Sequence, residues 1–178
     1  MDSIGRFVVV TKPTPYEGLV LASGSSVAAG FALKGSARDL TWYKAQHDRH
    51  ISSVTHVIKG LPKDISTVFV SSDLLKTFAF RDSDVIVVLG PDGLLANIAK
   101  YIVGGQLVIT VDSDSLTNGG KLMKHKPESV SKVIASLLDG TSSIAKLPLV
   151  SAKFENKDDE VLALNEILVG RLDQISSR

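Results

Sequence analysis

The chain has 178 residues and a mass of 19.0 kDa, with 20 Lys and Arg against 19 Asp and Glu, 44% hydrophobic residues and no cysteine. This length buries one sizeable core without disulfides or a structural metal. The lack of cysteine excludes zinc ribbons and thiolate catalysis, the near-zero net charge disfavours nucleic-acid binding, and no apolar run reaches the ~18 residues of a membrane span. With no signal peptide at the N-terminus, we expect a soluble cytoplasmic protein.

Four short, continuous apolar runs are typical of strands buried on both faces, as in a parallel sheet. In chain order they cover residues 6–11, 67–70, 84–89 and 107–111. Helices are predicted over residues 17–33, 51–61, 94–101 and 127–138. This alternation predicts an α/β fold with a doubly wound, Rossmann-like parallel sheet as the first domain, residues 1–140.

The pattern changes after residue 140. Residues 147–154 and 160–169 predict two strands, and the turn-rich residues between them predict an antiparallel hairpin. Residues 141–178 are therefore expected to begin a second, antiparallel β domain. Two strands cannot bury a core of their own, and their open edges favour pairing with another chain, so we expect a homo-oligomer.

A short acidic turn follows the third strand. Gly90, Pro91, Asp92 and Gly93 lie between a buried strand and a helix, where parallel strands face a ligand crevice and free helix amides favour phosphate. A carboxylate held there accepts a proton from a hydroxyl that attacks phosphorus. Taken alone, the four residues favour a simpler role for Asp92 as a helix N-cap in a tight turn.

A second acidic segment follows the fourth strand. Asp112 occupies the same strand-end position as Asp92, one βα unit later, so the two are expected to line one crevice. Turn and capping chemistry is the alternative, and it is favoured for Asp114 and Ser115 more than for Asp112.

Asn165 and Glu166 interrupt the last predicted strand. Both residue types are poor strand formers, so they indicate either hydrogen bonds to a polar ligand or an exposed edge strand, and the local pattern does not separate the two. His47 and His50 share a predicted helical face, but no third ligand accompanies them. We expect a solvated helix there and no metal site.

Together these motifs resemble the NAD kinase family. Residues 84–93 are similar to its strand plus Gly-Gly-Asp-Gly motif, and residues 163–166 to its Asn-Glu motif. Residues 111–114, followed by Gly119 and Gly120, resemble the loop in which an Asn-containing strand end precedes a glycine. Residues 170–178 resemble a short Ser-x-Arg element, and the resemblance as a whole runs from about residue 68 onward.

The resemblance implies a reaction. Members transfer the terminal phosphoryl group of ATP, or in some cases polyphosphate, to the 2′-hydroxyl of the adenosine ribose of NAD, giving NADP, with a divalent metal such as Mg²⁺. By this resemblance Asp92 would be the base or orienting carboxylate. The nucleotide-binding positions would be Gly90, Gly93, Asp112, Asn165 and Glu166. The expected partners are small nucleotides.

Several departures from the family pattern favour an alternative. Pro91 replaces the second glycine of the motif, Leu94 replaces the usual threonine, and Asp112 stands where many members have asparagine. The chain also ends at Arg178, before further strands of the family's β domain, so we expect a truncated or reduced relative. The alternative is a noncatalytic NAD-binding, ATP-binding or protein-interaction module with the same fold.

Overall fold

A computed structural model of the chain describes residues 4–102, 104–116, 120–155 and 157–167. The strands are β1 (Arg6–Thr11), β2 (Ser66–Ser71), β3 (Asp84–Leu89), β4 (Leu107–Val111), β5 (Val150–Phe154) and β6 (Lys157–Ala163). The helices are α1 (Pro15–Ser23), α2 (Ser26–Ala32), α3 (Leu40–Gly60), α4 (Asp92–Ala99) and α5 (Val130–Leu138), with short 3-10 turns η1 (Ser72–Leu74) and η2 (Pro127–Ser129). In the described part of the chain, no helix has both the length and the apolar character needed to cross a bilayer.

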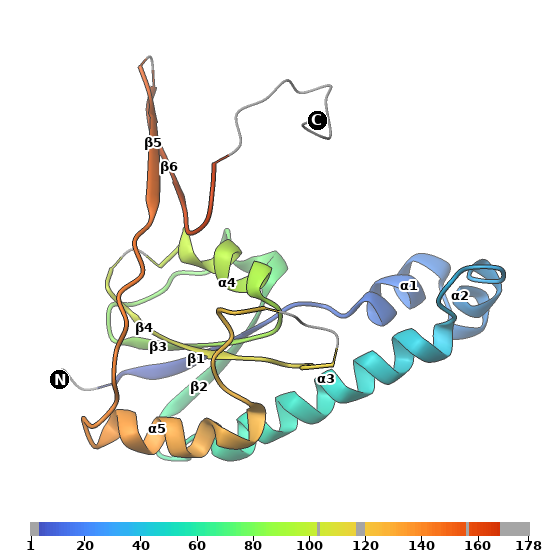
Figure 1. Cartoon of the computed structure of the whole chain (residues 1–178), viewed down its shortest axis with the longest axis horizontal. Coiled ribbons are helices and arrows are strands. Elements are labelled where there is room, and N and C mark those ends of the chain that lie inside the picture. Colours follow the sequence, from blue (N-terminus) through green and yellow to red (C-terminus); the bar gives the residue numbers. More distant parts are fainter. Residues whose placement is uncertain (1–3, 103, 117–119, 156, 168–178) are drawn as a thin grey trace.

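The first four strands form one parallel sheet in the order β2-β1-β3-β4 (Figure 1). β1 lies between two partners, so that Val8 pairs with Val68 of β2 and with Ile86 of β3. All six residues of β3 are buried, because it is an inner strand and helices cover both faces of the sheet. The doubly wound parallel α/β fold predicted from the continuous apolar runs is thus confirmed.

The core has two layers, one on each face of the sheet. Successive side chains of a strand point to opposite faces. Phe7 and Val9 of β1 therefore pack with α3 and α5, whereas Val8 and Val10 pack with α4. In Figure 1, α3 and α5 lie below the sheet and α4 lies above it. The unbroken apolar run of β1 follows from this burial on both sides.

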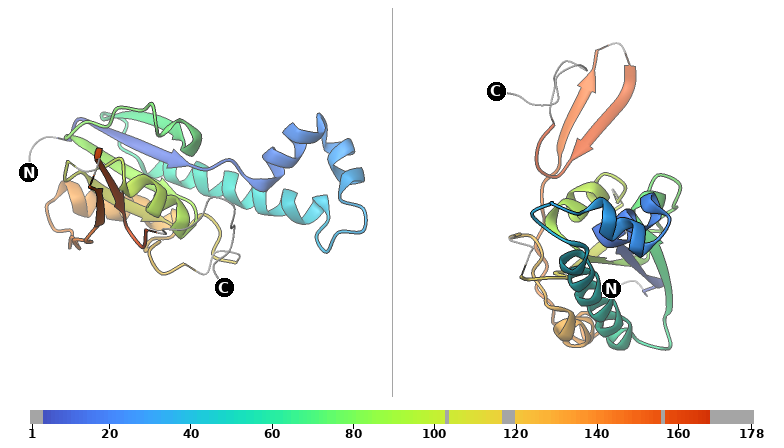
Figure 2. Two further views of the ribbon diagram at one scale, coloured as in Figure 1. Left: turned by 90° about the horizontal axis from the view of Figure 1, so that it is seen from above. Right: turned by 90° about the vertical axis from the view of Figure 1, so that its right-hand side faces the viewer.

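The helices before β2 differ from the prediction. The expected helix over residues 17–33 is two helices, because Gly24 ends α1 with a left-handed φ of 76°. α1 begins with a capping box in which Thr14 and Glu17 satisfy each other's backbone amides. α3 is longer than predicted and begins after Asp39, whose side chain caps it. Figure 2 shows α1, α2 and the first part of α3 extending past the sheet edge.

β5 and β6 pair antiparallel, with Val150 opposite Ala163, which confirms the predicted hairpin. In Figures 1 and 2 the hairpin lies on the α4 side of the sheet and projects outward from it. β6 ends at Ala163, so Asn165 and Glu166 lie beyond the strand in which the sequence placed them, as suits two poor strand formers. Gly119 and residues 168–178 fall outside the described residues, and the domain boundary at residue 140 stays a prediction.

Candidate functional site

A cavity of about 440 Å³ lies at the carboxyl edge of the sheet. β1 continues into α1 to α3, and α3 covers one face of the sheet, whereas β3 continues into α4 on the other face. The segments that follow β1 and β3 therefore run to opposite faces of the sheet from the point where these two strands end side by side. Open α/β sheets bind ligands at such a point. The cavity wall comes from four segments: residues 12–15 with Gly18, Gln46 with His50, residues 89–91, and Ser113 with Asp114.

Gly90 is the nucleotide-binding candidate that lines this cavity. Its amide donates a hydrogen bond of 3.1 Å to Val111 O, which joins the ends of β3 and β4. A Cβ at Gly90 would approach Leu94 Cδ2 at 2.9 Å, so glycine leaves room for the Leu94 side chain. Gly93 is exposed on the first turn of α4, and a Cβ there would meet no atom within 4 Å.

Asp92 is the first residue of α4, and its carboxylate accepts three backbone hydrogen bonds. The donors are the amides of Lys121 at 2.8 Å, Leu122 at 3.1 Å and Met123 at 3.2 Å. The N-cap of α4 is Pro91, without a side-chain cap bond, so the capping role expected for Asp92 is wrong. A Cβ at Gly120 would collide with the Asp92 carboxylate, so glycine permits the loop's approach. Asp92 thus fixes the loop that follows β4 against the start of α4.

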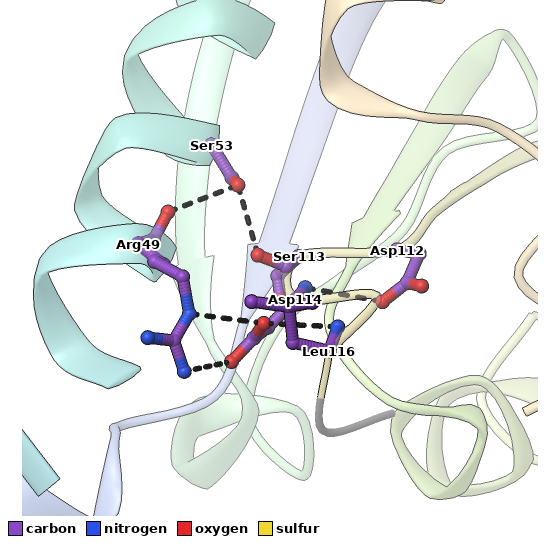
Figure 3. A network of polar contacts seen from close by, with 6 residues as sticks. All are labelled: Arg49, Ser53, Asp112, Ser113, Asp114 and Leu116. Carbon is purple, nitrogen blue, oxygen red and sulfur yellow. Dashed lines mark hydrogen bonds and ion pairs between the residues drawn. The ribbon is translucent and has the colours of Figure 1, made fainter. Parts of the chain in front are cut away.

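Asp112 and Asp114 build the turn after β4, and Asp114 ties that turn to α3 (Figure 3). Oδ1 of Asp112 accepts a 3.1 Å hydrogen bond from Asp114 N, and Oδ1 of Asp114 accepts one of 3.2 Å from Leu116 N. The Asp114 side chain is 4% exposed and pairs with Arg49 through contacts of 3.1 and 2.9 Å. Ser53 Oγ lies 2.9 Å from Ser113 O, which adds a second link between helix and turn. Asp114 lines the cavity, and half-buried Asp112 supports the turn.

A cluster of titratable groups joins α1 to α3 beside the cavity. The Thr14 hydroxyl donates to Glu17 Oε2 at 2.9 Å and lies 2.9 Å from His47 Nδ1. Burial acts to raise the pKa of Glu17, but the hydrogen bonds from Thr14 and the charges of His47 and His50 lower it overall. His47 and His50 lie on α3 as expected, and both side chains are half-buried rather than fully solvated. Within the described ranges, no group of three His, Asp or Glu side chains could hold a metal ion.

Asn165 and Glu166 lie apart from this cavity wall. Both side chains are exposed in the segment after β6. The preceding residue, Leu164, packs in the α4 layer of the core. The structure therefore brings together the ends of β3 and β4, with Gly90, Asp92 and Asp112, but of these three Gly90 lines the cavity. Asp92 and Asp112, which were expected to line one crevice, lie outside its described wall, as does the Asn-Glu pair.

Comparison of the sequence with protein-family models and with curated proteins gives no match. The resemblance to NAD kinases thus rests on the motifs and stays a prediction.

Sequence reasoning did not assign Lys12 or Arg49 to the site, and it weighed His50 only as a metal ligand before assigning it to a solvated helix. Lys12 follows the first strand, and strand-end position was the signal that could have marked it, as it marked Asp92. Arg49 and His50 lie on a helix with many polar residues, and the sequence carries no sign that Arg49 contacts a turn 65 residues away.

Proposed function

We propose that this chain binds a nucleotide in the cavity at the carboxyl edge of the sheet, and that NAD is the ligand its motifs favour. The observation that carries the proposal is the position of the cavity, between β1 and β3 where their connections diverge to opposite faces. Its volume of about 440 Å³ falls within the range of small-molecule sites. Lys12 adds a positive charge at the wall, which suits the phosphates of a nucleotide.

A substitution that narrows the cavity tests whether NAD binds in it. Gly18 lines the cavity, and a Cβ there would meet no atom within 4 Å, so Gly18→Leu adds bulk without a clash inside the protein. We expect Gly18→Leu to weaken NAD binding by about tenfold or more, measured by isothermal titration calorimetry. Ala22→Leu, one turn later on the exposed surface of α1, is the matched control. Equal NAD affinities in the two variants would place the ligand elsewhere.

The finer proposal is phosphoryl transfer from ATP to the ribose 2′-hydroxyl of NAD, with Asp92 accepting the hydroxyl proton or orienting the hydroxyl. Any Mg²⁺ would be held largely by the phosphates of the nucleotide, as is usual for this ion. Noncatalytic nucleotide binding is the second candidate. It is favoured by the Asp92 carboxylate, which is already engaged by three backbone amides.

NADP formation from NAD, ATP and Mg²⁺ separates these two candidates. If Asp92 is the base, Asp92→Asn lowers the rate by ~10²-fold or more and changes NAD affinity little. Asparagine also places an NH₂ group against the loop amides, so a second variant is needed. Gly120→Ala disturbs the same contact but keeps the carboxylate. Equal losses in both variants would assign the effect to the loop position, and binding without turnover in the unaltered chain would favour the noncatalytic module.

We also propose that the chain forms a homo-oligomer, in the cytoplasm, through its hairpin. Val150 and Val161 lie on one face of the hairpin, because Val150 pairs with Ala163 and Ala152 pairs with Val161. Both valines are more than 40% exposed. An apolar face of this kind is typical of a surface that packs on another chain.

A further inference from the structure

Two side chains in the cavity wall, those of Lys12 and His50, can carry positive charge. Lys12 lies on the segment between β1 and α1, and His50 lies on α3. Lys12 is exposed and His50 is half-buried. Among the described residues, neither side chain makes a hydrogen bond or an ion pair. A group bound in the cavity is therefore the partner available to both.

The charged groups that face His50 come from three elements. They are Glu17 on α1, His47 on α3 and Asp114 on the turn after β4. Glu17 is held by the Thr14 hydroxyl and amide, and Asp114 is paired with Arg49. The Asp114 charge is thus offset by Arg49, the Glu17 carboxylate is hydrogen-bonded by Thr14, and Lys12 supplies a positive charge to the cavity wall.

Burial of the ring favours the neutral form of His50. Burial lowers the pKa of His50, and the charge of His47 lowers it further, whereas the charges of Glu17 and Asp114 act in the opposite direction with a smaller net effect. A neutral imidazole in a half-buried position takes up a proton when an anion approaches, because the anion stabilises the charged ring.

We propose that Lys12 and His50 together bind a phosphate group of the ligand, and that His50 takes up a proton as this group binds. The inference rests on the proposed nucleotide binding and names the part of the nucleotide that this wall of the cavity recognises. The bound anion favours the charged ring, so affinity is greatest at low pH. Affinity falls as the pH rises through the titration of the bound state.

The direct test is a proton NMR titration of the histidine rings in the full chain, with and without inorganic pyrophosphate. The chain has four histidines, so single His→Gln variants assign every ring signal. We expect pyrophosphate to move the titration midpoint of His50 upward. His56 is exposed on the same helix and serves as the internal control, whose midpoint should stay in place.

The second test is NAD affinity between about pH 6 and pH 8, measured by calorimetry. We expect binding about tenfold weaker at the higher pH, and the dependence should vanish in His50→Gln. Lys12→Gln should weaken binding about tenfold at either pH. Lys12 is exposed, so its replacement does not endanger folding, and His56→Gln is the control that should retain wild-type behaviour.

The outcomes separate this inference from the proposed function. A shift of His50 by pyrophosphate without NAD binding would support the phosphate site and overturn the dinucleotide proposal. Binding of NAD with an unshifted His50, a flat pH profile and unaffected variants would overturn the phosphate site and leave nucleotide binding standing. A chain that responds to neither probe would overturn both.

Discussion

Asp84 lies at the start of β3 with its side chain fully buried beside Arg6. Its carboxylate accepts hydrogen bonds from Arg6 Nε at 2.7 Å, Arg6 Nη2 at 3.0 Å and Arg81 N at 2.8 Å. Burial acts to raise the pKa of Asp84, but these hydrogen bonds and the charge of Arg6 lower it overall. The carboxylate thus stabilises the fold while it is ionised.

Replacement of Asp84 by asparagine leaves the Arg6 guanidinium without its counter-charge in a mostly buried position. We expect Asp84→Asn to lower the free energy of unfolding by about 3 kcal/mol, measured by urea denaturation at neutral pH. The lowered pKa means that wild-type stability from this pair is present above about pH 4 and is lost as the pH falls through the folded-state value. The variant should lack this acid-dependent loss. A variant as stable as the wild type would show that the pair contributes nothing net.

At the scale of elements, the Arg49–Asp114 ion pair and the contact of the Ser53 hydroxyl with Ser113 O join α3 to the turn after β4 (Figure 3). Arg49→Ala leaves the buried Asp114 carboxylate without this partner, and we expect a loss of about 2 kcal/mol in the free energy of unfolding. NAD affinity should also fall, because Asp114 lines the cavity.

The matched control for Arg49→Ala is Lys44→Ala on the same helix. Lys44 pairs with Asp48, but both side chains are more than half exposed, and exposed pairs of this kind stabilise little. Thermal unfolding of the two variants checks the contrast. Equal decreases in the unfolding temperature of the two variants would mean that the destabilisation comes from losing a positive charge on the helix and not from losing the link to the turn.

The elements that the sequence predicts well are those whose own side chains fill the core. β1 and β3 are continuous apolar runs because helices cover both faces of the sheet. The apolar residues of these two segments therefore predict that the strands are buried. The first half of α3 was not predicted, because it packs on the small helices α1 and α2 and carries no clear apolar stripe.

The candidate site was predictable only in part for a related reason. Gly90 and Asp92 stand at a strand end, and strand ends can be found from local pattern. The three amides that hold Asp92 come from a loop about 30 residues later, and local pattern does not predict such a contact. Local pattern likewise does not predict the contact between Arg49 and Asp114. The sequence assigned Asp114 to a turn, and Asp114 does accept a hydrogen bond within that turn.

At the scale of the whole molecule, the hairpin is the part least supported by the rest of the chain. Its apolar face, with Val150 and Val161, is uncovered in the described structure. We expect light scattering at micromolar concentration to give at least twice the chain mass of 19.0 kDa. The double variant Val150→Ser with Val161→Ser should lower that mass, and Lys153→Ser on the opposite face should not. A stable monomer would contradict the proposal.

The central position of β1 has a consequence for the newly made chain. β1 is synthesised first but pairs on both sides, and the strand that covers its second edge is β3, completed only at residue 89. Until then Phe7 to Val10, all fully buried in the finished sheet, carry an open backbone edge. An edge of this kind can pair with a neighbouring nascent chain. Slower translation of residues 11–89 lengthens this interval, so the yield of folded protein should depend on translation speed and on chaperones that shield extended apolar segments.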